Sequence, residues 1–163
     1  MVRRLDPVWG DDFKQANDET FFYTNSTPQH GNLNQKTWND LEDYVLDNTK
    51  AHDLRVCVFT GPVFADDDPV YRDVRLPQQF WKVVTVVNGD TNTLHTTAYI
   101  LSQKDMLNDL EFVFGQFRTY QLPIAVLEEK TQLSFGKLVN FDPLKQESVF
   151  PIREISRLEE VVL

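Results

Sequence analysis

The stretch FWKVVTVVNGD, residues 80–90, decides the fold class of this chain. Residues 80–87 form an apolar, β-branched run that is typical of a buried strand. Asn88-Gly89-Asp90 follows it and is a strong hairpin signal. The chain then returns through residues 93–101, which have the composition of a partner strand. We therefore expect two antiparallel strands joined by a tight turn.

Further strands are expected on both sides of this hairpin. The run LRVCVFT, residues 54–60, predicts a buried strand, with the single cysteine, Cys57, as a small buried hydrophobe. Residues 111–120 are another strand candidate. Together these runs predict an α+β fold with a central antiparallel sheet that extends from residue 54 to residue 120.

One helix is expected before the sheet and one after it. Residues 34–47 carry apolar side chains three to four positions apart, which predicts a helix that packs on the sheet through Trp38 and Leu41. Pro123 is expected to open a short helix over residues 124–131, since proline is tolerated in the first turn.

The two ends of the chain are less regular. Residues 1–33 are expected to be loop with one short strand at residues 20–24. We expect a domain over residues 1–143 and a tail over residues 144–163, whose apolar positions three apart favour a docked helix.

The composition excludes several classes of protein. Counts of 25 acidic and 16 basic residues give a net charge of -9, which argues against a protein that coats nucleic acid through an overall positive field. No apolar run reaches the roughly 18 residues of a membrane span, so we expect no membrane partner. A single cysteine excludes an intrachain disulfide and a cysteine metal cage. The aspartates 66–68 predict a solvated loop, because three adjacent carboxylates repel one another. A divalent-ion site is the less favoured alternative, since a Ca²⁺ site needs further oxygen ligands at alternating positions.

The densest chemical signal lies in residues 22–44. The run FYTNSTPQ, residues 22–29, is followed by Asn34-Gln35, then by Trp38 and by Leu41-Glu42. Taken one at a time, Asn34 is typical of a helix cap, Glu42 of an exposed helix charge and Asn25 of a turn.

Taken together, these residues resemble the DNA/RNA non-specific endonuclease family, the ββα-metal or His-Me finger nucleases that include endonuclease G. The family signature is an Asp-Arg-Gly-His strand end, an Asn-x-x-Pro-Gln segment, and a helix with Asn-Gln-x-x-Trp-x-x-Leu-Glu. The second and third parts match this chain. Residues 58–64, 77–83 and 123–135 resemble later segments, with Gln132 where the family usually has glycine. The resemblance covers about residues 1–140.

The resemblance implies an endonuclease that cleaves DNA and RNA without sequence choice and uses Mg²⁺ or another divalent cation such as Mn²⁺. It implies Asn34 as the metal ligand, and Glu42 and Asn25 as candidate catalytic residues, Glu42 through the water shell of the ion and Asn25 near the scissile phosphate. Arg3 and Arg4 are candidates for phosphate contacts. The spacing is compatible, because Glu42 lies eight residues, or about two helical turns, after Asn34.

The first part of the signature is absent from these 163 residues. Family members that resemble this chain continue after the histidine as Met-Val-Arg-Arg, and this chain begins Met1-Val2-Arg3-Arg4. On that alignment the general base and the strands before it are missing, which implies a partial ββα-metal finger with little or no activity. His30 lies four residues before Asn34, but the family places its base on a strand across from the helix.

Three functions therefore stay open at the level of sequence. They are the endonuclease, an inactive relative that binds metal, nucleic acid or a protein, and an α+β interaction module without a nuclease link. DNA and RNA are the expected partners, with a homodimer or an inhibitor protein as further candidates. The resemblance suggests a secreted or extracytoplasmic bacterial protein.

Overall fold

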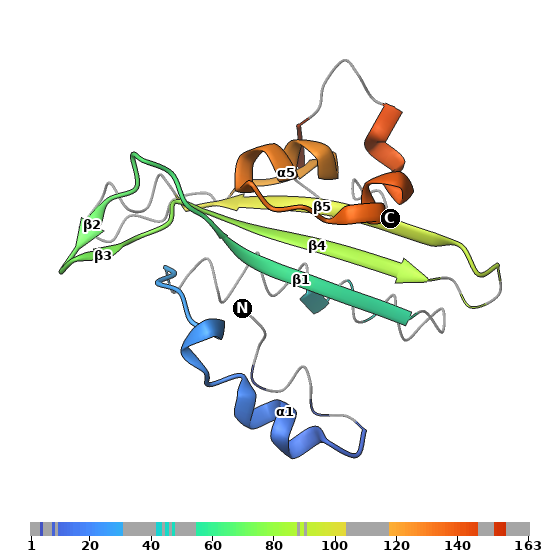
Figure 1. Ribbon diagram of the computed structural model, residues 1–163, viewed down its shortest axis with the longest axis horizontal. Coiled ribbons are helices and arrows are strands. Elements are labelled where there is room, and N and C mark those ends of the chain that lie inside the picture. The colour runs from blue at the N-terminus through green and yellow to red at the C-terminus, as the bar shows by residue number, and fades with distance from the viewer. Residues whose placement is uncertain are drawn as a thin grey trace.

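The computed structural model describes residues 10–30, 55–87, 91–103, 118–146 and 152–155, together with Arg4, Val8, Glu42, Asp43, Val45, Asp47 and Gly89. A five-stranded antiparallel sheet, in the order β1-β4-β5-β6-β7, forms its centre (Figure 1). The strands are β1 (Arg55–Val63), β4 (Gln79–Val87), β5 (Leu94–Ser102), β6 (Arg118–Leu122) and β7 (Arg153–Ile155). A small ribbon of β2 (Val70–Tyr71) and β3 (Val74–Arg75) projects from the connection between β1 and β4.

The hairpin expected from the sequence is the middle of this sheet. β4 pairs with β5 along its whole length, from Gln79 opposite Ser102 to Val87 opposite Leu94. β1 pairs with the other edge of β4, from Arg55 opposite Val87 to Val63 opposite Gln79. The predicted α+β class and the antiparallel sheet are confirmed.

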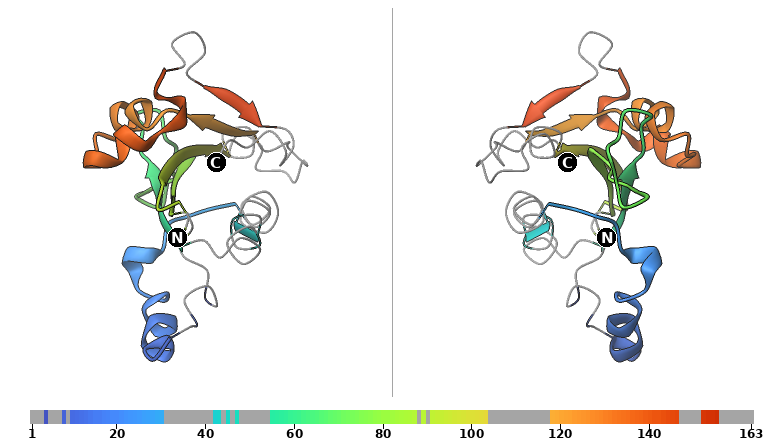
Figure 2. Two further views of the ribbon diagram at one scale, coloured as in Figure 1. Left: turned by 90° about the vertical axis from the view of Figure 1, so that its right-hand side faces the viewer. Right: turned by 90° about the vertical axis from the view of Figure 1, so that its left-hand side faces the viewer.

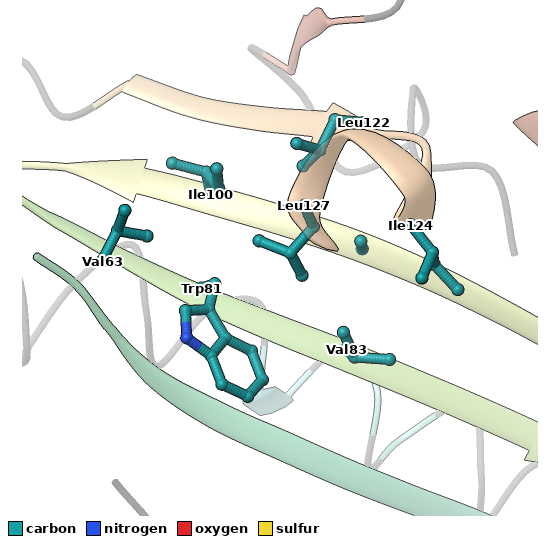
Figure 3. Packing of buried hydrophobic residues seen from close by; sticks show 8 residues of the cluster. Val63, Trp81, Val83, Ile100, Leu122, Ile124 and Leu127 are labelled. Carbon is teal, nitrogen blue, oxygen red and sulfur yellow. The ribbon is translucent and has the colours of Figure 1, made fainter. Parts of the chain in front are cut away.

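Both faces of the central strands are buried, because successive side chains of a strand point to opposite faces. One face is covered by α5 (Ile124–Thr131) and the 3-10 helix η2 (Gly136–Phe141) (Figure 2). Its core, shown in Figure 3, consists of Val63, Trp81, Val83, Ala98, Ile100, Leu122, Ile124 and Leu127. On the other face Val45 packs against Val84 of β4 and Tyr99 of β5.

The helix predicted after Pro123 is confirmed as α5. Its first backbone N–H, on Ile124, donates to Oδ2 of the buried Asp142 at 2.7 Å. The helix ends at Gln132, which has a φ of 57°, the left-handed conformation that favours glycine. A glutamine thus adopts the conformation that glycine takes most readily.

Residues 20–24 are not the strand that the sequence predicted. The chain forms the helix α1 (Phe13–Glu19) and the 3-10 turn η1 (Tyr23–Asn25) instead. Nδ2 of Asn25 donates to the carbonyl oxygen of Thr20 at 2.9 Å, and the hydroxyl of Thr20 donates to the carbonyl oxygen of Asn17 at 2.7 Å. Such side-chain to backbone bonds offer the chain an alternative to strand pairing.

The prediction that residues 54–60 form a buried strand is wrong in one respect. The strand exists as β1, but only Val63 of it is buried, and Arg55, Cys57, Val58 and Phe59 are exposed. Within the described residues β1 pairs with β4 alone, so it lies at an edge of the sheet. An apolar run predicts a strand but does not show whether that strand has neighbours on both sides.

The tail also differs from its expectation where the structure describes it. Arg153–Ile155 form β7, which pairs with β6, whereas the spacing favoured a docked helix. The segment completes hydrogen bonds along an edge of β6 that would otherwise be open. Residues 143–146 form a further 3-10 helix, η3 (Pro143–Gln146).

The other predictions fall partly outside the described residues. Glu42, Asp43, Val45 and Asp47 are helical, as predicted for residues 34–47, but Trp38 and Leu41 are not described. Of the predicted strand 111–120, only the part from residue 118 is described, as the start of β6. None of the described helices is both long and apolar enough to cross a membrane.

Candidate functional site

Glu42 occupies a buried position on the described helical segment. It is 8% exposed, and its Oε1 accepts a hydrogen bond from Nζ of Lys82 at 2.6 Å. Lys82 lies in the middle of β4 and is 2% exposed. Because an unpaired charge is very costly to bury, each of these residues requires the other. A glutamate on a helix is usually exposed, but Glu42 is buried.

The surroundings of the pair fix it in place. Lys82 stands directly opposite Tyr99 of β5 in the strand register. Tyr99 packs with Val45 and Val84 in the smaller apolar cluster, and residues opposite one another in an antiparallel pair share a face. Lys82 and the smaller apolar cluster thus lie on one face of the sheet, and Glu42 contacts that face through its ion pair with Lys82.

Asn25 and Arg4 each contact a residue of the turn that follows α1. Nδ2 of Asn25 donates to the carbonyl oxygen of Thr20, which fixes the plane of its amide group. The guanidinium of Arg4 lies 5.2 Å from the centre of the Phe21 ring, in a cation–π contact. Two of the predicted site residues therefore contact neighbouring residues of one turn, while Glu42 is held by β4.

The segment that leads from Asn25 toward Asn34 is also attached to the sheet. The backbone N–H of His30 donates to Oε1 of Gln103 at 2.9 Å, although 73 residues separate them in sequence. Asn34 and Arg3 lie outside the described residues, so the predictions for them stay predictions.

The donor chemistry fits a hard divalent cation. Asn34 and Asn25 offer amide oxygens and Glu42 a carboxylate, and Mg²⁺ prefers oxygen ligands while it keeps several of its waters. The pairing with Lys82 compensates the charge of Glu42. In the part of the chain that the structure describes, no group of three His, Cys, Asp or Glu side chains could hold a metal.

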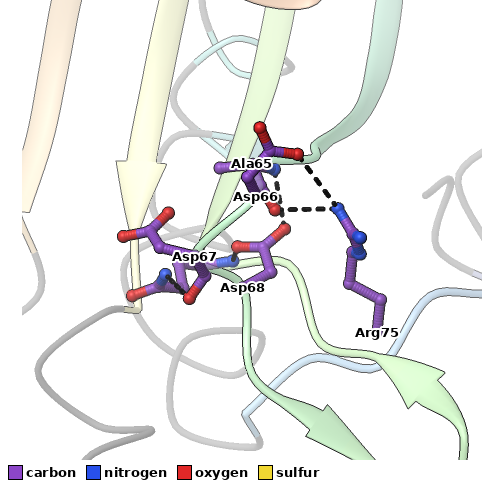
Figure 4. A network of polar contacts seen from close by, with 6 residues as sticks. Ala65, Asp66, Asp67, Asp68 and Arg75 are labelled. Carbon is purple, nitrogen blue, oxygen red and sulfur yellow. Dashed lines mark hydrogen bonds and ion pairs between the residues drawn. The ribbon is translucent and has the colours of Figure 1, made fainter.

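The aspartate run 66–68 is a structural loop (Figure 4). Asp66 and Asp67 are exposed, as predicted for a solvated loop, but Asp68 is buried. Its two carboxylate oxygens accept the backbone N–H groups of Ala65 at 2.9 Å and Gln78 at 3.0 Å. Arg75 reaches the same loop through the carbonyl oxygen of Ala65 and the carboxylate of Asp66.

Two residues of the site region were missed by the sequence analysis. They are Lys82 and Gln103. A signal existed for Lys82, because a single charge in the middle of an apolar strand must find a partner if the strand is buried on both faces. No comparable pattern marks Gln103, whose partners are distant in the sequence.

The protein has an α+β fold in which the buried carboxylate of Glu42, on a helical segment, is paired with Lys82 of an antiparallel sheet. Residues 1–142 match the family described as DNA/RNA non-specific endonuclease, and the chain belongs to this family. The resemblance stated from the motif is therefore confirmed.

Individual relatives agree with this assignment. The chain is 40% identical over 148 residues to the uncharacterized protein y4fB of Sinorhizobium fredii, which covers 83% of this chain and 22% of the relative. It is 43% identical over 51 residues to the mitochondrial endonuclease G of Homo sapiens, covering 31% of this chain and 17% of the relative, and equally to that of Bos taurus. The chain thus spans about a fifth of the length of these curated relatives. No solved structure matches it.

Proposed function

We propose that this chain is part of a Mg²⁺-dependent endonuclease that cleaves DNA and RNA phosphodiesters without sequence choice. The observation that supports this proposal best is the buried Glu42, fixed by Lys82 at 2.6 Å at the position that the family motif gives to its carboxylate. A helix glutamate without a task is normally exposed, and burying it with a lysine brings little stability.

The roles of the side chains follow from their chemistry. A bound Mg²⁺ would neutralise the charge that develops on the leaving oxygen. Asn34 would hold the ion through its amide oxygen, and Glu42 would orient water beside it. Asn25 would lie near the scissile phosphate, and Arg3 and Arg4 would contact the nucleic-acid backbone. Lys82 would keep the carboxylate of Glu42 in one orientation.

The 163-residue polypeptide itself is expected to cleave poorly. Its histidines are His30, His52 and His95, and none of them stands in an Asp-Arg-Gly-His segment. Loss of a general base typically removes about two to four orders of magnitude from the rate. Robust Mg²⁺-dependent plasmid cleavage by the tag-free chain, unchanged in His30→Ala, would contradict this expectation.

The decisive experiment uses a longer polypeptide that supplies an Asp-Arg-Gly-His segment ahead of Met1. There Asn34→Ala should abolish Mg²⁺-dependent plasmid cleavage, because it removes the one direct protein ligand. Glu42→Ala should lower the rate by about 10- to 100-fold, because it acts through a bound water. The matched control is Asn140→Ala, an exposed asparagine of η2 on the opposite face of the sheet. If folded Asn34→Ala cleaves like the wild type at low Mg²⁺, Asn34 is only a helix cap.

The alternative is an inactive relative that binds nucleic acid or a protein. The same longer polypeptide separates the two functions. An inactive relative would bind DNA in a gel-shift assay but would not cleave it at any Mg²⁺ or Mn²⁺ concentration.

A further inference from the structure

Gln103, the residue after β5, is a polar side chain that is 1% exposed. Its Oε1 accepts the backbone N–H of His30 at 2.9 Å, and its Nε2 donates to the carbonyl oxygen of Pro77 at 2.7 Å. Its own backbone N–H donates to the carbonyl oxygen of Gln78 at 2.8 Å. One buried residue therefore joins three segments that are far apart in the sequence.

The two side-chain contacts require an amide. The N–H of His30 needs an acceptor, and the carbonyl oxygen of Pro77 needs a donor, and glutamine supplies both from one planar group. Glutamate at this position would keep the acceptor but would turn a second oxygen toward Pro77. Methionine has a similar length and would satisfy neither partner. Buried polar groups are nearly always hydrogen-bonded, so the fit at Gln103 is specific.

His30 lies in the chain between two residues of the candidate site. Asn25 is five residues before it and Asn34 is four residues after it. At its start, this segment is tied by the bond from Asn25 to Thr20, and at His30 it is tied to Gln103. Gln103 therefore fixes the backbone of the described segment that precedes Asn34 in the sequence.

The same sheet also anchors the other half of the site. Lys82 of β4 holds Glu42, and β4 is paired with β5 as far as Gln79 opposite Ser102, next to Gln103. The β4–β5 hairpin is therefore a common frame for the carboxylate and for the segment that enters Asn34.

We propose that Gln103 is a positioning residue of the nuclease site, which holds the backbone at His30 on the same β4–β5 hairpin that holds Glu42. This inference rests on the proposed function, because the metal site at Asn34 is what the frame serves. Gln103 acts through the backbone of His30 and has no contact of its own with the ion or the substrate.

The test compares Gln103→Met with Gln78→Met in the 163-residue chain. Gln78 is a suitable control, since it is also a buried glutamine, 8% exposed, but its Nε2 donates to the carbonyl oxygen of Asp67 in the acidic loop. Three quantities are measured for each variant. They are the melting temperature, the exchange rate of the His30 amide proton by NMR, and the dissociation constant of Mn²⁺ by calorimetry.

We expect both variants to lower the melting temperature, but only Gln103→Met to change the site. In that variant the His30 amide should lose its protection, and Mn²⁺ should bind about 10-fold more weakly or worse, as is common for residues that orient metal ligands. Gln103→Glu keeps the acceptor for His30 and should lie between the wild type and Gln103→Met in both quantities. If Gln103→Met does not fold, Gln103→Glu is compared with Gln78→Met instead.

Two results would overturn the inference. One is a folded Gln103→Met or Gln103→Glu that binds Mn²⁺ like the wild type although the His30 amide has lost its protection. The other is an equal loss of affinity in Gln78→Met. A wild-type chain that binds no Mn²⁺ would instead contradict the proposed metal site. The positioning role is then decided by the NMR shift of the Asn34 side-chain amide, which must move in Gln103→Met and not in Gln78→Met.

Discussion

Glu42 and Lys82 are buried charges of opposite sign whose Oε1 and Nζ atoms lie 2.6 Å apart. Removing each ion from water costs several kcal/mol, and their attraction offsets this cost only while both are present. An apolar pair of similar volume would often stabilise such a site equally well or better. The stability of the fold therefore does not by itself account for the pair.

Lys82→Met should lower the free energy of unfolding by about 3 to 5 kcal/mol, because it leaves Glu42 buried without its counterion. The double variant Lys82→Met/Glu42→Leu should recover most of that loss, since both charges are then gone. Urea unfolding of the wild type, of Lys82→Met, of Glu42→Leu and of the double variant completes a double-mutant cycle. The cycle gives the interaction energy of the pair.

The exposed ion pair of Arg75 and Asp66, at 3.9 Å, provides the control. Arg75→Met should change stability much less than Lys82→Met, because water screens this pair. A double variant as unstable as Lys82→Met alone would show that packing around Lys82, and not charge pairing, sets the cost.

At the scale of elements, β1 pairs with β4 along one side, while several of its side chains are exposed. At Gly61 a Cβ atom would lie 2.9 Å from the Trp81 indole, so only glycine allows β1 and β4 to approach this closely. On the same strand Val58 is 40% and Phe59 is 44% exposed. Among the described strands β1 pairs with β4 alone, and an edge strand offers backbone groups and apolar side chains for further contacts.

Cys57 reports on this edge, because it lies on β1 and is exposed. The folded chain should react with a thiol reagent such as Ellman's reagent at a rate within about tenfold of the urea-unfolded chain, since access governs the rate. Cys57→Ser should show no reaction. Protection by more than about 100-fold in the folded chain would mean that β1 is covered in solution.

For the whole molecule, the net charge of -9 opposes the approach of DNA and RNA. Attraction must then come from a few local cations, and Arg4 is one candidate, held over Phe21 at the turn beside Asn25. A protein that contacts few phosphates releases few counterions on binding. Binding should therefore depend only weakly on the salt concentration.

We expect the logarithm of the DNA association constant to fall with the logarithm of salt concentration with a slope of about -1 to -3, measured by fluorescence anisotropy in EDTA. Arg4→Ala should reduce the size of this slope by about one, the value for one lost phosphate contact. Lys130→Ala, an exposed residue of α5, should leave the slope unchanged. An equal effect of the two substitutions would exclude a specific role for Arg4.

The sequence alone determined the features that depend on near neighbours. The β4–β5 hairpin followed from two apolar runs around Asn88-Gly89, and α5 followed from Pro123 and the residues after it. The family followed from a motif within residues 22–44, and the match over residues 1–142 confirms it. Such signals are readable because turn chemistry and side-chain periodicity act over a few residues.

Only the tertiary structure decided which distant segments meet. It placed β1 at an edge with Cys57 exposed, paired β7 with β6, and brought Lys82 to Glu42 across 40 residues and Gln103 to His30 across 73. An apolar run has the same composition at an edge as in the centre of a sheet. A polar residue in the sequence does not reveal its partner, because the pairing depends on how the whole chain closes around one core.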